Sequence, residues 1–99
     1  MKRYIAAVNG LSKDDEQKFL GFIRENGWGW WHRIDNFWMI IDRKDQSSTE
    51  QIRDFLMPLS GTIGIVIEVP DTSNSWHGFA PEASLEKVFS WVHVTWPND

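Results

Sequence analysis

Four segments have the apolar patterning of β-strands. Residues 3–9 are apolar on both sides, which is typical of a strand at the centre of a sheet. Residues 28–33 and 37–42 are rich in aromatic and β-branched residues and are separated by a short polar turn, so they predict a hairpin. Residues 62–69 predict a fourth strand, with isoleucine and valine on one side and Gly64, Val66 and Glu68 on the other.

Two segments have the 3.6-residue period of amphipathic helices. Residues 13–26 begin after Ser12, a good N-cap, and carry acidic residues in the first turn, where the helix dipole favours them. Residues 48–59 begin with a capping box and place apolar side chains at i, i+3, i+4 and i+7. Pro58 predicts an irregular last turn, and Ser60-Gly61 a stop.

The C-terminal segment supports two readings. Residues 81–92 have helical spacing after Pro81, whereas residues 91–96 also resemble a short β segment. We expect a helix over residues 81–92, followed by an extended end.

The order βαββαβ with an added C-terminal element predicts one α/β domain over residues 1–99. Right-handed crossovers would give a four-stranded antiparallel sheet of order 4-1-3-2, a ferredoxin-like α+β sandwich. Both helices would then cover the same face of the sheet. The other face would need the C-terminal segment, a second subunit or a ligand to cover it, because exposed tryptophans would form a large apolar patch.

Composition narrows the possible functions. The chain has no cysteine, which excludes disulfides, thiolate metal sites and a cysteine nucleophile. No apolar run has the length of a membrane span and the first residues do not resemble a signal peptide, so we expect a cytoplasmic protein without membrane contact. The net charge of −4 disfavours general affinity for nucleic acid. Seven tryptophans in 99 residues are a large excess and favour a protein interface.

Several segments resemble a known group of proteins in order and spacing. They are Trp30-Trp31-His32, Phe37-Trp38-Met39-Ile40, residues 48–56 (STEQIRDFL), residues 65–69 (IVIEV), Trp76-His77-Gly78-Phe79 and Glu82-Ala83-Ser84. The chain is similar to small bacterial and phage proteins labelled "SinR family", related to the VapD toxins, the GhoS antitoxin and the small adaptation protein of CRISPR systems. The resemblance implies a ferredoxin-like fold, a homodimer and a role in toxin–antitoxin or phage–host conflict.

The same resemblance bears on catalysis. Nucleases of the larger family hold a divalent cation with an aspartate at the end of the first strand, and the matching residue here is Asn9. A neutral amide lacks the charge that Mg²⁺ requires. The three histidines, His32, His77 and His93, have no metal-ligand spacing. We therefore expect no catalytic residues, no metal and no cofactor.

The candidate binding residues are aromatic or basic side chains near the hairpin and in the C-terminal loop: Trp31, Arg33, Trp38, Trp76 and His77. Strand alternation places Trp31 and Arg33 on one face, and we expect the hairpin to bring Arg33 near Arg43 and Lys44. For His32 we expect ring packing on the sheet with a hydrogen bond to a neighbour.

The function predicted from these residues is a non-catalytic protein-interaction module that binds a protein partner, itself as a homodimer, or both. Two alternatives stay open. One is a metal-dependent endoribonuclease or other nuclease of the same fold, and the other is a non-catalytic nucleic-acid-binding module.

Overall fold

The computed structural model describes residues 1–59, 63–70 and 76–97. Its elements are β1 (Lys2–Val8), α1 (Lys13–Glu25), β2 (Gly29–Ile34), β3 (Phe37–Asp42), α2 (Thr49–Leu56), β4 (Gly64–Val69), the 3₁₀ turn η1 (Glu82–Ser84) and α3 (Leu85–Val94). The predicted stop at Ser60-Gly61 and the predicted first residue of the fourth strand, Thr62, lie outside the described residues.

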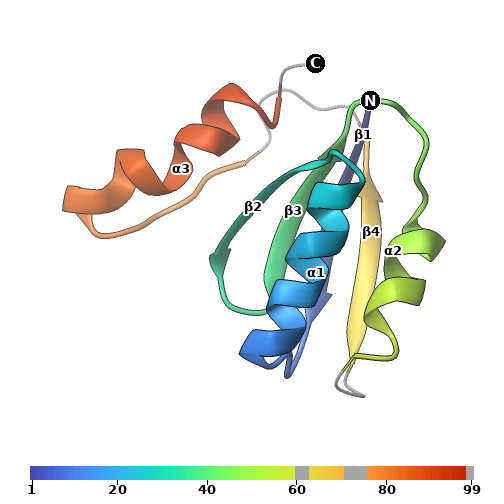
Figure 1. Cartoon of the computed structure of the whole chain (residues 1–99). Coiled ribbons are helices and arrows are strands. Elements are labelled where there is room, and N and C mark those ends of the chain that lie inside the picture. Colours follow the sequence, from blue (N-terminus) through green and yellow to red (C-terminus); the bar gives the residue numbers. More distant parts are fainter. Residues whose placement is uncertain (60–62, 71–75, 98–99) are drawn as a thin grey trace.

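The four strands form one antiparallel sheet of order β2-β3-β1-β4, which is β4-β1-β3-β2 from the other edge. Helices α1 and α2 pack on one face of the sheet, and α3 lies on the other side, next to β2 (Figure 1). The chain is thus a mixed α/β structure with helices on both sides of a central sheet. Helix α3 covers only part of the sheet face opposite α1 and α2.

The local signals at the helix ends act as the sequence predicts. The side chains of Ser12 and Ser48 each accept a hydrogen bond from the backbone N–H three residues on, and so cap α1 and α2. Helix α2 ends earlier than predicted, at Leu56, and Met57 is its C-cap. The next residue, Pro58, has no backbone N–H with which to continue the helical hydrogen bonds.

The C-terminal segment is helical, but its predicted extended end is wrong. Helix α3 continues to Val94, and the N–H groups of Thr95 and Trp96 both donate to the carbonyl of Trp91. These hydrogen bonds continue the helical turn, which turns Trp96 back onto the sheet, where it is buried.

The main core lies between the sheet and helices α1 and α2. Phe19 meets Trp38 edge to face at 4.9 Å, and Phe22 stacks on Phe55 at 4.2 Å between the two helices. The even-numbered residues of β1 point into this core, and the odd-numbered ones point to the opposite face.

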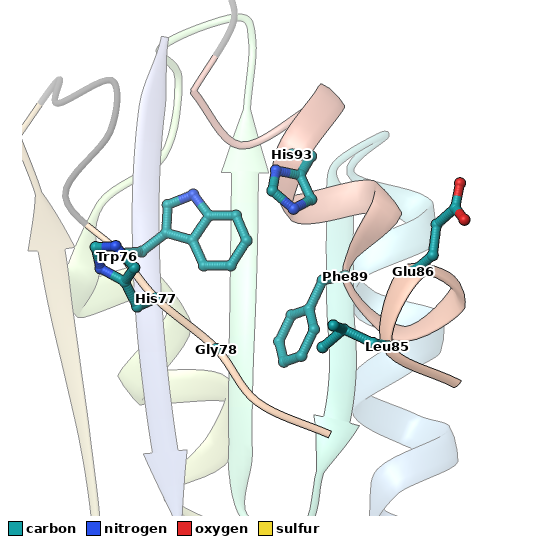
Figure 2. Close-up of a pocket in the computed structure, with 7 residues that line it drawn as sticks. All are labelled: Trp76, His77, Gly78, Leu85, Glu86, Phe89 and His93. Carbon is teal, nitrogen blue, oxygen red and sulfur yellow. The ribbon is translucent and has the colours of Figure 1, made fainter. Parts of the chain in front are cut away.

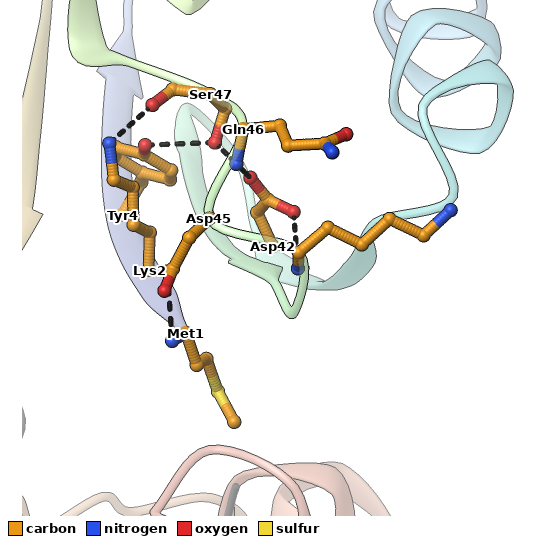
Figure 3. Close-up of polar contacts among 8 residues, drawn as sticks. Met1, Lys2, Tyr4, Asp42, Asp45, Gln46 and Ser47 are labelled. Atoms are coloured by element: carbon orange, nitrogen blue, oxygen red, sulfur yellow. Dashed lines mark hydrogen bonds and ion pairs between the residues drawn. The ribbon is translucent and has the colours of Figure 1, made fainter.

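A buried polar network joins the start of β1 to the loop after β3 (Figure 3). Asp42 accepts hydrogen bonds from the Ser47 hydroxyl and from the N–H groups of Lys44 and Gln46. Ser47 also contacts the hydroxyl of Tyr4 at 2.9 Å, and burial raises the pKa of that phenol. The network fixes the loop that leads into α2.

The ionised form of Asp42 stabilises the fold. Burial alone would raise the pKa of this carboxyl, but the hydrogen bonds from the Ser47 hydroxyl and from the backbone N–H groups of Lys44, Gln46 and Ser47 outweigh it and hold the pKa below its ordinary value of 3.8. This stabilisation is complete above the pKa of the unfolded chain and is lost as the pH falls through the folded pKa.

We therefore expect the free energy of unfolding to fall on acidification, and Asp42→Asn to lower it by about 1–3 kcal/mol at neutral pH. Urea denaturation measured between neutral and acidic pH checks both effects. Glu25→Gln, at an exposed carboxyl on α1, is the control. An Asp42→Asn variant that kept wild-type stability at neutral pH would contradict this role.

Candidate binding surface

The sheet face opposite α1 and α2 presents two apolar rows that cross all four strands. Cα pairing aligns Ile67, Ile5, Met39 and Trp31 in one row, and Ile65, Ala7, Phe37 and Ile34 in the next. Because side chains alternate across a strand, every member of these rows points to the same side.

Helix α3 covers most of the β2–β3 half of this face, but not Ile34 at the end of β2. The indole N–H of Trp31 donates to the carbonyl of Val88 at 2.8 Å, and the Trp31 ring stacks on Phe89 at 5.7 Å. The guanidinium of the buried Arg3 donates to the carbonyl of Trp96 at 2.5 Å. Hydrogen bonds thus hold the C-terminal segment on the sheet at two points, Val88 within α3 and Trp96 just after it.

The rest of the face is open. Ile65 is 58% exposed, Ile67 49% and Ile34 54%, although all three belong to the apolar rows. The sequence predicts that the C-terminal segment, a subunit or a ligand must cover this face. The C-terminal segment is there, but it covers only part of the face.

An apolar groove of about 490 Å³ lies between the open face and the segment that precedes α3. The sheet contributes its floor, and Trp76, Gly78 and Phe79 form one wall. Phe79 is 94% exposed at the rim of this groove. We call the groove and the adjoining Ile34, Ile65 and Ile67 the open apolar surface.

A second hollow, of about 530 Å³, lies between residues 76–78 and α3 (Figure 2). The rings of Trp76 and His93 face each other there, 4.8 Å apart, with Phe89 beside them. Gly78 crosses close to Phe89, and a Cβ on this glycine would lie only 2.5 Å from the ring. The close approach therefore depends on the absence of a side chain at residue 78.

The structure brings three of the five predicted binding residues to this region. Trp31 lies on the floor of the groove and is 5% exposed, because α3 covers it. Trp76 and the exposed His77 line both the groove and the second hollow. Of these, Trp76 and His77 are within reach of a partner without movement of α3.

Arg33 does not share the face of Trp31, contrary to the sequence prediction. The β2–β3 pairing shifts register between Trp31 and Ile34, so Ile34 takes the groove side. Arg33 instead lines a polar hollow on the α1 side together with Glu16 and Asp35.

The predicted basic cluster does not form either. In the antiparallel hairpin Gly29 is opposite Ile41, and the guanidinium of Arg43 lies 3.7 Å from the Cβ position of Gly29. Arg43 is therefore at the opposite end of β2 from Arg33.

Trp38 lies in the main core and is 2% exposed, so it is not part of the open apolar surface. Its ring stacks on His32 at 3.6 Å, and its indole N–H has no hydrogen-bond partner among the described residues. The two ring nitrogens of His32 bond the carbonyl of Phe37 and the carboxylate of Glu16, each at 2.9 Å. The predicted packing role of His32 is confirmed.

The sequence did not single out Phe79 and Phe89 as groove residues, nor Ile34, Ile65 and Ile67 as exposed ones. Ile65 and Ile67 had a signal, since one side of residues 62–69 is wholly aliphatic, but that pattern is also typical of a covered strand. Only the position of α3 shows that this side of β4 is left open.

Comparison with known proteins gives no match: no family model, no curated protein and no solved structure is similar to this chain. Over residues 1–59, 63–70 and 76–97, no group of three or more His, Asp or Glu side chains is placed to hold a metal ion. Within the same residues, every helix is too short or too polar to cross a membrane.

We expect Gly78→Ala to separate residues 76–79 from α3, because the new Cβ must push the Phe89 ring off Trp31. Near-UV circular dichroism and tryptophan fluorescence would report the lost aromatic contacts. Gly21→Ala is the matched control: nothing lies within 4 Å of its Cβ position, so this helical change should stabilise the fold by up to about 1 kcal/mol. Identical aromatic spectra for Gly78→Ala and wild type would contradict the close contact.

Proposed function

We propose that the chain is a ferredoxin-like protein-interaction module that binds an apolar segment of a partner protein on the open apolar surface. The order β4-β1-β3-β2 and the two helices on one face support the ferredoxin-like assignment. The interaction role rests on one observation, the aliphatic rows that α3 leaves uncovered beside an apolar groove.

The free energy of burying apolar side chains favours the binding of a partner on the open apolar surface. Full burial of an isoleucine or phenylalanine side chain stabilises by about 1.5–3 kcal/mol relative to exposure. In the isolated chain this burial free energy is not gained by four exposed side chains, those of Ile34, Ile65, Ile67 and Phe79. A partner that covered them would recover this free energy, and His77 at the groove rim supplies a polar group to orient it.

The occupant we propose is an extended or helical protein segment with apolar side chains on one side. The groove is lined almost wholly by apolar and aromatic residues, which are the composition of interface cores and not of phosphate-binding surfaces. The separation of Arg33 from Arg43 leaves the hairpin without the basic patch that a nucleic-acid module needs. A toxin–antitoxin or phage–host setting follows from the sequence resemblance and is part of the same proposal.

The metal-dependent nuclease is the competing function. Incubation of the protein with RNA or DNA and Mg²⁺ or Mn²⁺ tests it directly. We expect no cleavage, because Asn9 offers a neutral amide where a carboxylate is required. Cleavage that is lost in Asn9→Ala or His32→Ala would overturn the proposal.

The interaction itself is tested by a photo-crosslinking amino acid placed in cells at Phe79, with the same group at the exposed Asp54 of α2 as the control. We expect one protein to be crosslinked from residue 79 and not from residue 54. After purification, its affinity should fall at least tenfold in Ile34→Asp, because a buried unpaired charge is costly, and stay unchanged in Val94→Asp, at an exposed apolar residue of α3 outside the groove. Equal binding by both variants would contradict the proposed surface.

A further inference from the structure

We propose that two copies of this chain associate by pairing the free edges of β4 in antiparallel fashion, so that the two sheets become one. The inference is independent of the partner segment proposed above, because edge pairing leaves the open apolar surface accessible. It rests on the hydrogen-bonding direction of β4, on the contrast between the two sheet edges, and on a charge pair that the two-fold symmetry creates.

The outward groups of β4 follow from its pairing with β1. The N–H of Asn9 donates to the carbonyl of Ile63 at 2.9 Å, and hydrogen-bonded pairs alternate along an antiparallel ladder. The N–H and C=O groups of Gly64, Val66 and Glu68 therefore point away from β1. No described segment pairs with that side of β4, and Gly64 and Glu68 are exposed.

The two edges of the sheet differ in how they resist pairing. The β2 edge carries a register shift, the charged Arg33, and α3 packed beside it. Strand β4, with the sequence GIVIEV, has a continuous register and neither lysine nor proline. Proteins protect free edges by such bulges, charges and prolines, and β4 has only the single charge of Glu68, so its regular edge is a template for another strand.

A second copy fits this edge without conflict. In an antiparallel pair centred on Val66, each Val66 is opposite its symmetry mate, and Glu68 of one copy is opposite Gly64 of the other. Each of these pairs exchanges two backbone hydrogen bonds. On the open face, Ile65 meets Ile67 across the junction, which continues the aliphatic rows into the second copy.

The charges are complementary in this register. Glu68 lies on the same side of β4 as Gly64 and Val66, the side on which α2 packs. Arg53 of α2 lines the hollow formed by Gly64 and Val66, where its exposed guanidinium also pairs with Asp54 at 2.8 Å and Glu50 at 3.7 Å on the same helix. Each Glu68 carboxylate would thus face the Arg53 guanidinium of the other copy, over a glycine that leaves room for it. The two glutamates lie at opposite ends of the paired strands, so they do not repel each other.

This arrangement predicts a two-fold dimer, which light scattering with size-exclusion chromatography measures from micromolar to millimolar concentration. We expect the dissociation constant to rise about tenfold or more in Arg53→Glu and in Glu68→Lys, since each change replaces attraction by repulsion at both symmetry-related contacts. The double variant Arg53→Glu with Glu68→Lys should restore dimerisation. Arg33→Glu, the same charge change at the other edge, should have no effect.

Hydrogen exchange distinguishes edge pairing from any other dimer. As the concentration rises, the amides of Gly64, Val66 and Glu68 should become protected, whereas those of Ile65 and Ile67 are protected already by β1. A chain that stays monomeric at millimolar concentration would overturn the proposal, as would a dimer in which these three amides exchange as in the monomer. Neither result would bear on the partner-binding groove, which the crosslinking experiment tests separately.

Discussion

The structure depends on the unequal covering of a sheet that is apolar on both faces. Strand β1 supplies Tyr4, Ala6 and Val8 to one face and Ile5 and Ala7 to the other, so neither side can be left to water without loss of stability. Helices α1 and α2 cover most of the first face. The second face has only α3, and a single helix about 10 Å in diameter covers about two strands that lie about 4.8 Å apart.

The position of α3 decides which part of the second face stays open. Two hydrogen bonds to backbone carbonyls, from Trp31 to Val88 and from Arg3 to Trp96, hold the C-terminal segment over β2 and β3. These contacts join residues far apart in the sequence, and they supply carbonyl acceptors to buried donors. The tryptophans therefore have two roles. Some indole rings are buried in the cores, whereas Trp76 lines the groove within reach of a partner.

The sequence predicts those features that depend on local periodicity and caps. The Ser12 and Ser48 caps and the hairpin follow from spacing alone. The predictions from the sequence are wrong where the structure depends on contacts between residues far apart in the chain. A register shift in β2 moved Arg33 to the other side, and the packing of Trp96 on the sheet extended a helix that its pattern would end earlier. The open side of β4 has the same aliphatic pattern that a covered strand would have, so no sequence pattern could identify it.

The accessibility of the isoleucine methyl groups to a soluble paramagnetic probe tests the half-covered sheet most directly. All isoleucines are observed together in a methyl NMR spectrum of the labelled protein. We expect strong broadening of the methyl signals of Ile34, Ile65 and Ile67 and little effect on those of the buried Ile23, Ile40 and Ile52. Equal protection of all six would show that the second face is covered in the isolated chain, and would contradict the open apolar surface.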